Sequence, residues 1–200
     1  MTVFHQDGDY AAFLKLLNEA NERVSMRLLS FCLMPNHFHL VAWPRRDGDL
    51  SRWMQWLLTA HVRRYHRYHG TSGHVWQGRF KAFPVQSDGH LHAVMRYVER
   101  NPVRAKTIPV RRAENWPWSS AGAPPDGVDP VALHAGPITK KRNWLAWVNQ
   151  PLTKAELSAV RTCVERGQPY GDGNWQKRTA KRLGLDSTMR PRGRPRKKKK

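Results

Sequence analysis

The stretch covering residues 27–44, RLLSFCLMPNHFHLVAWP, constrains the fold more than any other part of the chain. It is typical of two apolar strands joined by a turn at Met34-Pro35-Asn36. Because side chains alternate between the two faces of a strand, His37 and His39 share one face with Val41. The apolar side chains between them fall on the opposite face. The sequence therefore predicts a hairpin with a core-facing side and two adjacent imidazoles on the other side.

Two imidazoles at this spacing can bind one divalent metal ion, although a histidine pair in a strand is more commonly packed or solvated. A metal site would need a third ligand, which a helix further along the chain can supply. Asp88 is a typical N-cap for this helix, and Pro102 is expected to end it. Tyr97 and Asn101 are four residues apart, so they lie about 6 Å apart along the axis on one face. The alternative is a half-buried core tyrosine followed by an asparagine that only caps the helix.

Four blocks of sequence, taken in order, resemble the REP-associated tyrosine transposases, which are single-tyrosine HUH transposases of bacteria. The blocks are FCLMPNHFHLVAWP (residues 31–44), GHVWQGRFKAFPV (73–85), RYVERNPVRA (96–105) and WPWSS (116–120). The resemblance covers about residues 4–122 and implies that His37, His39 and Asn101 hold Mg²⁺ or Mn²⁺. It also implies that Tyr97 is the nucleophile on a phosphodiester of single-stranded DNA, in a hairpin of repetitive extragenic palindrome type.

The chemistry of these residues agrees with the resemblance. A divalent ion neutralises the anionic oxygens that protect a phosphodiester from attack. A tyrosine nucleophile, unlike water, keeps the broken strand covalently attached as a 5′-phosphotyrosine, so the same site can join it to another end. The runner-up hypothesis is a domesticated, non-catalytic protein that binds DNA hairpins.

The resemblance implies an α+β fold of the HUH endonuclease type, with a ferredoxin-like, mainly antiparallel sheet and helices on one face. Apolar periodicity predicts helices over about residues 8–22 and 50–68 and a third strand over about residues 78–86. Members of the family usually begin with a further strand before the first helix. Residues 1–4 stand where that strand should already be finished, so we expect the edge of the sheet to be completed differently or the start to be truncated.

Changes in composition divide the chain into three parts. Residues 1–122 form the transposase domain, residues 123–186 a small helical C-terminal extension, and residues 187–200 a basic tail. Thr153 and Glu156 form a capping-box pattern that predicts one helix of the extension, and a second helix is expected over about residues 175–185. The tail resembles an AT-hook around Arg192 and Arg194, and an electrostatic tether without sequence preference is an equal alternative.

The chain is strongly basic, with 35 Lys and Arg against 15 Asp and Glu and a net charge of +20. Such a charge indicates a polyanionic partner, and we expect single-stranded and hairpin DNA. Arg79, Arg100 and Arg104 are candidate DNA contacts in addition to the tail. Six further histidines lack the pairing of a zinc site and are expected mostly at the surface: His61, His66, His69, His74, His90 and His92.

Several features limit the cellular setting that we expect. The two cysteines, Cys32 and Cys163, form no metal-binding or disulfide pattern. No apolar run is long enough to cross a membrane, and no signal peptide is visible. We therefore expect a monomer or homodimer without a membrane partner, in the cytoplasm and associated with the nucleoid.

Overall fold

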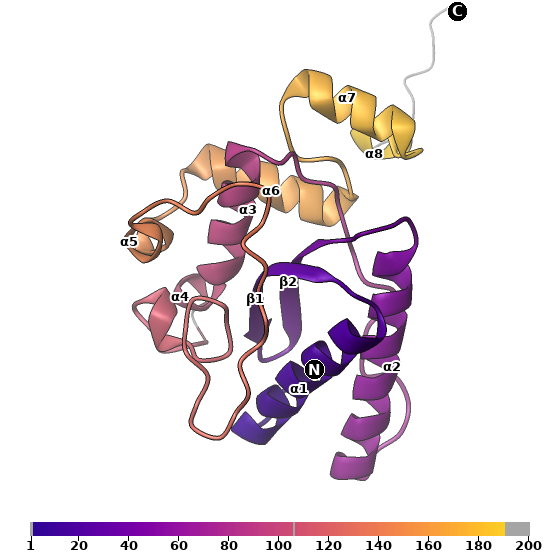
Figure 1. Cartoon of the computed structure of the whole chain (residues 1–200), viewed down its shortest axis with the longest axis vertical. Coiled ribbons are helices and arrows are strands. Elements are labelled where there is room, and N and C mark those ends of the chain that lie inside the picture. The colour runs from indigo at the N-terminus through magenta and orange to yellow at the C-terminus, as the bar shows by residue number, and fades with distance from the viewer. Residues whose placement is uncertain (1, 106, 191–200) are drawn as a thin grey trace, which may run out of the picture.

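The computed structural model describes residues 2–105 and 107–190, and its α+β architecture is built around one β hairpin (Figure 1). Strands β1 (Arg27–Met34) and β2 (His37–Trp43) pair antiparallel, with Met34 opposite His37 and Arg27 opposite Trp43. The register shifts once, between Leu28 and Ser30. The hairpin and its turn are thus where the sequence predicted them.

Helices cover both faces of this hairpin. Helices α1 (Asp7–Arg23) and α2 (Asp49–His69) pack on one face, and α3 (Gly89–Glu99) packs on the other (Figure 1). Successive residues of β1 alternate between the two cores: Leu33 belongs to the first and Met34 to the second. The prediction of helices on one face was wrong, because β1 is apolar on both sides and both sides must be covered.

The predicted third strand does not form in the described residues, whose sheet has two strands. Residues 78–86 instead run to the C-terminal extension, where Val85 makes an isolated parallel bridge to Tyr170. The outer edge of β1 is taken by the WPWSS block: Leu33 N donates to Trp118 O (2.8 Å), and Ser120 N donates to Phe31 O (2.9 Å). A pairing distant in sequence therefore occupies the edge, and the ferredoxin-like sheet remains a prediction.

The N-terminal residues are held against the hairpin turn. The backbone N–H groups of Val3 and Phe4 both donate to Pro35 O, at 2.8 and 3.0 Å. The Phe4 ring is buried between α1 and α2, where it packs on Phe13 and His61. The start of the described chain thus closes the first core instead of adding a strand to the sheet.

Helix α3 begins where the sequence predicted, because the Asp88 side chain accepts a hydrogen bond from His90 N (2.8 Å). Pro102 does not end the helical path, contrary to the prediction. A short helix α4 (Asn101–Arg104) follows directly, with Pro102 in its first turn. Backbone N–H groups in the first turn of a helix have no acceptor within the helix, so a proline, which lacks this group, is tolerated there.

The C-terminal extension is helical, as predicted. It contains α5 (Trp144–Asn149), α6 (Lys154–Arg166), α7 (Gly173–Arg182) and α8 (Asp186–Met189), after a short 3₁₀ helix η1 (Ala113–Asn115). The capping box forms: Glu156 N donates to Thr153 Oγ1 (3.1 Å), and Thr153 N donates to Glu156 Oε2 (2.7 Å). Arg192 and Arg194 lie outside the described residues, so the AT-hook remains a prediction.

The extension shares the second core with α3 instead of standing apart. Trp144 and Val148 of α5 and Val160 and Cys163 of α6 are buried there. Cys32 and Cys163 are both buried free thiols. Among the described residues, no helix combines the length and the apolar character needed to cross a membrane.

His61 departs from the expectation of surface histidines, because it is 4% exposed within the first core. It packs against Phe4, Phe13 and Trp76, and its Nδ1 has no hydrogen-bond partner among the described residues. Burial is the largest cause that lowers the pKa of this imidazole, to about 4, and nearby Arg64 and His69 lower it further while Asp9 opposes them. The ring is therefore neutral in the folded protein at neutral pH.

This buried imidazole predicts a loss of stability in acid. The unfolded chain binds a proton at His61 near pH 6.5 and the folded chain only near pH 4, so the folded state loses about 3 kcal/mol as pH falls across this interval. Denaturant unfolding at pH 7.5 and pH 4 should show this loss. His61→Phe keeps a flat ring and removes the titration, so its pH dependence should be smaller by that amount. An equal pH dependence in both proteins would contradict this assignment.

Candidate active site

The two imidazoles of the hairpin lie side by side at the start of β2. His37 Nε2 and His39 Nε2 are 3.1 Å apart. Two nitrogens bound at right angles to one ion, each about 2.1 Å from it, lie about 3 Å apart. The pair therefore has the spacing of two adjacent ligands of a single metal ion.

Asn36 orients the first of these rings. His37 Nδ1 lies 2.6 Å from Asn36 Oδ1, and an amide oxygen can only accept, so Nδ1 carries the proton. Nε2 of a neutral His37 is then free of a proton and directs its lone pair toward His39. Hydrogen bonds of this kind fix the tautomer of metal-binding histidines. This role of Asn36 was not predicted from the sequence, although the position of Asn36 directly before His37 was a signal.

The electrostatics of the pair favour the neutral form that binds metals. Burial lowers the pKa of His39 to about 3, and the neighbouring His37 and Arg104 act in the same direction. Burial, followed by Arg104, also lowers the pKa of His37. Neither imidazole therefore needs to release a proton before it coordinates an ion at neutral pH.

Tyr97 comes from the opposite element, α3, and faces this pair. Its ring centroid lies 5.8 Å from that of His39, with an interplanar angle of 82°. The side chain is 7% exposed, and its hydroxyl accepts a long hydrogen bond from Arg104 Nη2 (3.4 Å). The Arg104 guanidinium also lies over the ring, 5.0 Å from the centroid. The fold thus brings together a phenol, two imidazoles and one guanidinium.

The nitrogen and the oxygen of the Asn101 side-chain amide make different contacts. Nδ2 donates to the carbonyl oxygens of Tyr97 (2.9 Å) and Val98 (3.4 Å), near the point where Pro102 offers no N–H. The helix-capping alternative is therefore realised by the nitrogen. Oδ1, the predicted metal ligand, accepts a hydrogen bond from Arg104 Nη2. Arg104 therefore places a positive charge beside the oxygen that the ion would use.

The histidine pair has the spacing to bind a divalent ion, and a third protein ligand would have to come from a side chain other than His, Cys, Asp or Glu. No group of three or more His, Cys, Asp or Glu side chains in the described ranges could hold a metal. The side-chain oxygen of Asn101, the ligand that the sequence predicted, is linked through Arg104 Nη2 to the Tyr97 hydroxyl. Mixed nitrogen and oxygen donors suit Mn²⁺ or Mg²⁺ better than a closed structural zinc site.

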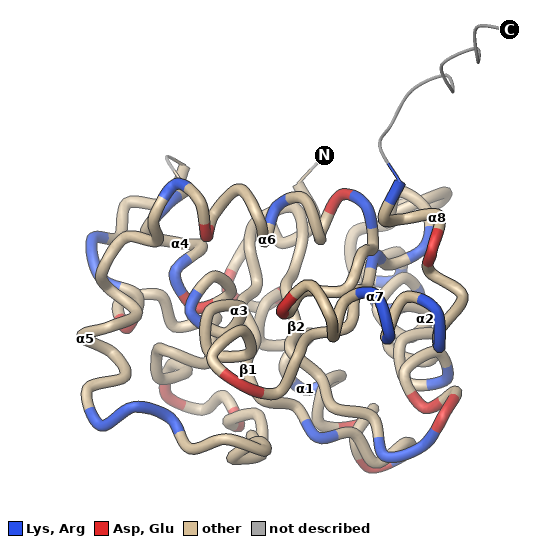
Figure 2. Tube along the Cα trace, turned by 90° about the horizontal axis from the view of Figure 1, so that it is seen from above, with Lys and Arg blue, Asp and Glu red and all other residues tan. Residues whose placement is uncertain are grey.

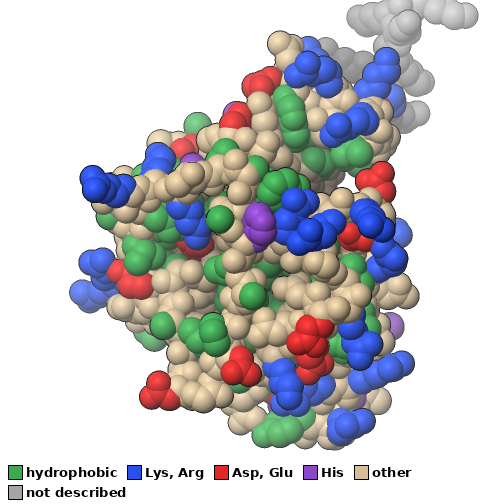
Figure 3. Space-filling view, in the orientation of Figure 1, with side chains coloured by type: hydrophobic (Ala, Val, Ile, Leu, Met, Phe, Trp, Pro, Cys, Tyr) green, Lys and Arg blue, Asp and Glu red, His purple; other side chains and the backbone are tan. Residues whose placement is uncertain are grey.

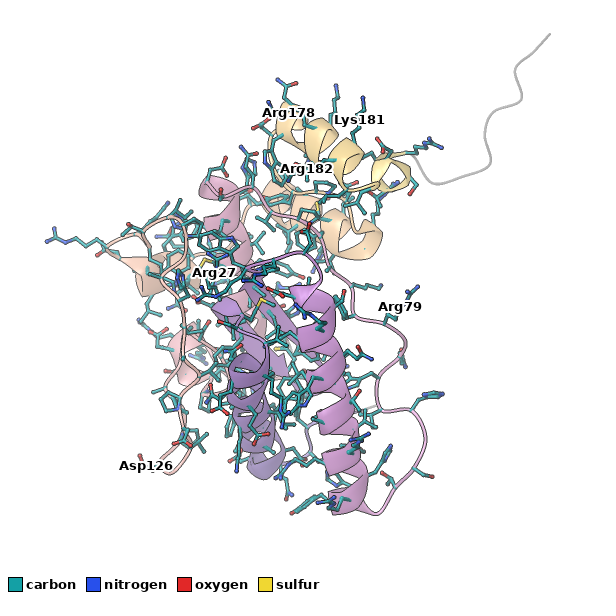
Figure 4. The ribbon with its side chains drawn as sticks, turned by 45° about the vertical axis from the view of Figure 1, so that its right-hand side comes forward. Arg27, Arg79, Asp126, Arg178, Lys181 and Arg182 are labelled. Carbon is teal, nitrogen blue, oxygen red and sulfur yellow. The ribbon has the colours of Figure 1, made fainter. Side chains whose placement is uncertain are left out.

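The other predicted DNA contacts do not join this site. Arg100 donates to the carbonyl oxygens of Val148 (3.4 Å) and Asn149, so it binds the C-terminal end of α5. Arg79 is exposed in the loop between α2 and α3 and projects away from the body of the molecule (Figure 4). Arg104 alone among the three lies against Tyr97.

A second basic feature lies on α7. Its exposed cations, spaced one and four residues apart, form one stripe that we call the α7 stripe: Lys177, Arg178, Lys181 and Arg182. Arg178, Lys181 and Arg182 are labelled on α7 in Figure 4, and basic side chains gather at the same end of the molecule in Figure 3. Figure 2 shows basic positions along the α7 trace. Within the described chain, none of the four makes an ion pair with a carboxylate.

The segment just before α7 packs on the helix that carries Tyr97. The Tyr170 ring lies 5.1 Å from that of His90 in the first turn of α3. Tyr97 follows His90 by seven residues, which is about 10 Å along the helix axis. Helix α3 therefore runs from this contact to the candidate site.

Comparison with known proteins identifies the family of the chain. The family described as "Transposase IS200 like" matches residues 1–101, which include both histidines, Tyr97 and Asn101. The chain belongs to this family of transposases. No curated protein and no solved structure matches the chain.

Proposed function

We propose that this IS200-like transposase is a single-tyrosine HUH enzyme that nicks and joins single-stranded DNA. The observation that carries the proposal is the meeting of Tyr97 with His37 and His39, which lie about sixty residues earlier in the chain, at a ring separation of 5.8 Å from His39. A phenol beside a neutral imidazole pair of this spacing has the parts required for metal-assisted transfer of a phosphodiester.

In the proposed reaction the Tyr97 oxygen attacks phosphorus. The new bond is Tyr97 O–P, and the bond between phosphorus and the 3′ oxygen of the preceding nucleotide breaks. The products are a 5′-phosphotyrosine and a free 3′-hydroxyl, with the phenol proton balancing the proton that the 3′ oxygen gains. His37, His39 and Asn101 would hold Mg²⁺ or Mn²⁺, which neutralises charge on the phosphate oxygens when bound. Rejoining is the reverse step with another 3′-hydroxyl.

We propose hairpins of repetitive extragenic palindrome type as substrates. The support is the ordered resemblance of four sequence blocks to the REP-associated tyrosine transposases. The protein would act on single-stranded and hairpin DNA as a monomer or homodimer, in the cytoplasm near the nucleoid. Arg79, Arg104 and the tail residues Arg192 and Arg194 are proposed to contact DNA, whereas the contacts of Arg100 favour a structural role.

The test is direct detection of the covalent intermediate. Purified protein would be mixed with an end-labelled single-stranded hairpin of repetitive palindrome sequence, with Mn²⁺ or Mg²⁺, and separated on a denaturing gel. A labelled band at the mass of the protein plus the 3′ part of the strand is expected. Tight hairpin binding with no adduct in either metal would favour the non-catalytic binder instead.

The α7 stripe predicts a charge-dependent contribution to duplex binding. Replacing its four cations with glutamine should weaken binding to a DNA hairpin stem and reduce the slope of log K against log salt by up to about 3–4. Because the stripe is remote from Tyr97, adduct formation on an unstructured single strand should not change. The matched control replaces four exposed cations on separate segments, Lys15, Arg111, Arg142 and Lys154, with glutamine. Equal losses in both variants would mean that only net charge matters.

A further inference from the structure

We propose that Arg104 is a positioning residue that couples metal binding to the nucleophile, because one of its nitrogens binds both Tyr97 and Asn101. The proposal rests on the function proposed above and adds a residue role to it. Arg104 Nη2 donates to the Tyr97 hydroxyl (3.4 Å) and to Asn101 Oδ1. The same group therefore touches the proposed nucleophilic atom and the proposed ligand atom.

The positive charge of Arg104 lies beside the candidate site and is not neutralised by a carboxylate of the described residues. No carboxylate within the described residues forms an ion pair with it. The neighbouring arginines of this region are used differently: Arg96 donates to Gln150 O (2.8 Å) and Pro151 O (2.7 Å), and Arg100 binds the end of α5. Those two fasten the extension to α3, whereas Arg104 contacts side chains of the candidate site.

The position of Arg104 follows from the helical path that continues from α3 into α4. Arg104 lies seven residues after Tyr97, which is two helical turns, so the two side chains share a face. Its guanidinium covers the Tyr97 ring at 5.0 Å from the centroid and restricts where the phenol can point. The side chain is only partly buried, so a DNA phosphate can approach it.

Competition for Asn101 Oδ1 follows from this arrangement. A cation held by the same amide oxygen would lie close to the guanidinium, and the two positive charges would repel each other. A bound ion would therefore weaken the contact between Arg104 and Asn101. The guanidinium donors would remain beside the Tyr97 hydroxyl, where a non-bridging oxygen of the DNA phosphate is a matching acceptor. Arg104 would then hold the phosphate close to the nucleophile.

The competition predicts opposite effects of one substitution on two measurements. Arg104→Met keeps an unbranched stem and removes both charge and donors. Mn²⁺ affinity of the DNA-free protein, measured by titration with detection of free Mn²⁺ by electron paramagnetic resonance, should rise by about three- to tenfold. The rate of adduct formation at saturating Mn²⁺ should fall by about 10²-fold, which is typical for loss of one donor to a developing oxyanion. A residue that only supports the fold would lower both.

Two further variants make the test specific. Arg104→Lys keeps the charge and loses the planar fork, so its Mn²⁺ affinity should stay near the wild-type value while its adduct rate recovers only in part. Arg100→Met removes the adjacent arginine, which binds α5 carbonyls, and should leave Mn²⁺ affinity unchanged. Unchanged or weaker Mn²⁺ binding in Arg104→Met would overturn the proposal. If the wild-type protein forms no adduct at all, the proposed function fails, and the Mn²⁺ titrations still decide whether Arg104 competes with the ion.

Discussion

Tyr97→Phe is expected to fold normally, bind hairpin DNA with wild-type affinity and form no covalent adduct. The substitution removes only the hydroxyl, whose hydrogen bond to Arg104 is long at 3.4 Å. The ring stays in the second core, where Tyr97 is 7% exposed, so the cost in stability should be below about 1 kcal/mol. Adduct formation should drop below detection, because no other oxygen occupies that position. Denaturing gels with end-labelled hairpin DNA measure the adduct, and salt-matched titrations measure the affinity.

Tyr65→Phe is the matched control for this experiment. Tyr65 is also buried, and its hydroxyl is paired with His5 Nε2 (3.1 Å) in the first core, away from the histidine pair. This variant should form the adduct at the wild-type rate. An adduct that persists in Tyr97→Phe and disappears in Tyr65→Phe or Tyr68→Phe would move the nucleophile to α2.

Removal of the metal should be equally severe. Chelation by EDTA, or His39→Ala, is expected to abolish cleavage and to change hairpin affinity by less than about threefold, since Lys and Arg contacts to phosphates provide most of the affinity. His39 is one of two nitrogen donors 3.1 Å apart, so its loss leaves one imidazole and one amide oxygen for the ion.

The control for the histidine substitution is His74→Ala, which removes an exposed imidazole from the loop after α2. Cleavage by this variant should be unaffected. Mn²⁺ titration of His39→Ala should show weak or undetectable binding, and excess Mn²⁺ should restore little activity. Full cleavage in EDTA would disprove the role of the ion, whatever the substitutions do.

Local sequence patterns predicted the parts of the fold that depend on neighbouring residues. The alternation around His37 placed both imidazoles on one face, the turn residues fixed the hairpin, and Asp88 marked the start of α3. Each of these depends on contacts within a few residues. The helix over residues 154–166 was predicted for the same reason, because its capping box is a local motif.

Contacts between distant segments could not be predicted in this way. The edge of β1 is paired by residues 118–120, almost ninety positions away. Nothing in the sequence of residues 78–86 shows that they do not form a strand of this sheet. The guanidinium of Arg100 carries the same charge as that of Arg104, and only the position of α5 decides that one binds carbonyl oxygens and the other the phenol. His61 could not be assigned to the core, because its burial depends on Phe4 reaching it from the N-terminus.

The sequence named the residues of the candidate site but left the role of Asn101 open. The spacing of Tyr97 and Asn101 put them on one face, and the alternatives for Asn101, ligand or helix cap, could not be separated. In the structure the nitrogen of the amide caps α3, and its oxygen accepts a hydrogen bond from Arg104. A single side chain thus contacts both the end of α3 and Arg104.

The carboxylate of Glu99 connects α3, the helix that carries Tyr97, to residues far beyond the family match. Glu99 is fully buried and accepts hydrogen bonds from Ser120 Oγ (2.8 Å) and Trp144 Nε1 (2.6 Å), with Lys140 Nζ at 3.5 Å. A chain cut after residue 122 would keep Ser120 but lose Trp144 and the positive charge of Lys140, and loss of the partner of a buried charge typically costs several kcal/mol. We therefore expect the helix that carries Tyr97 and the extension to unfold together. The smallest part of this protein able to keep Tyr97 in place is longer than the segment that defines its family.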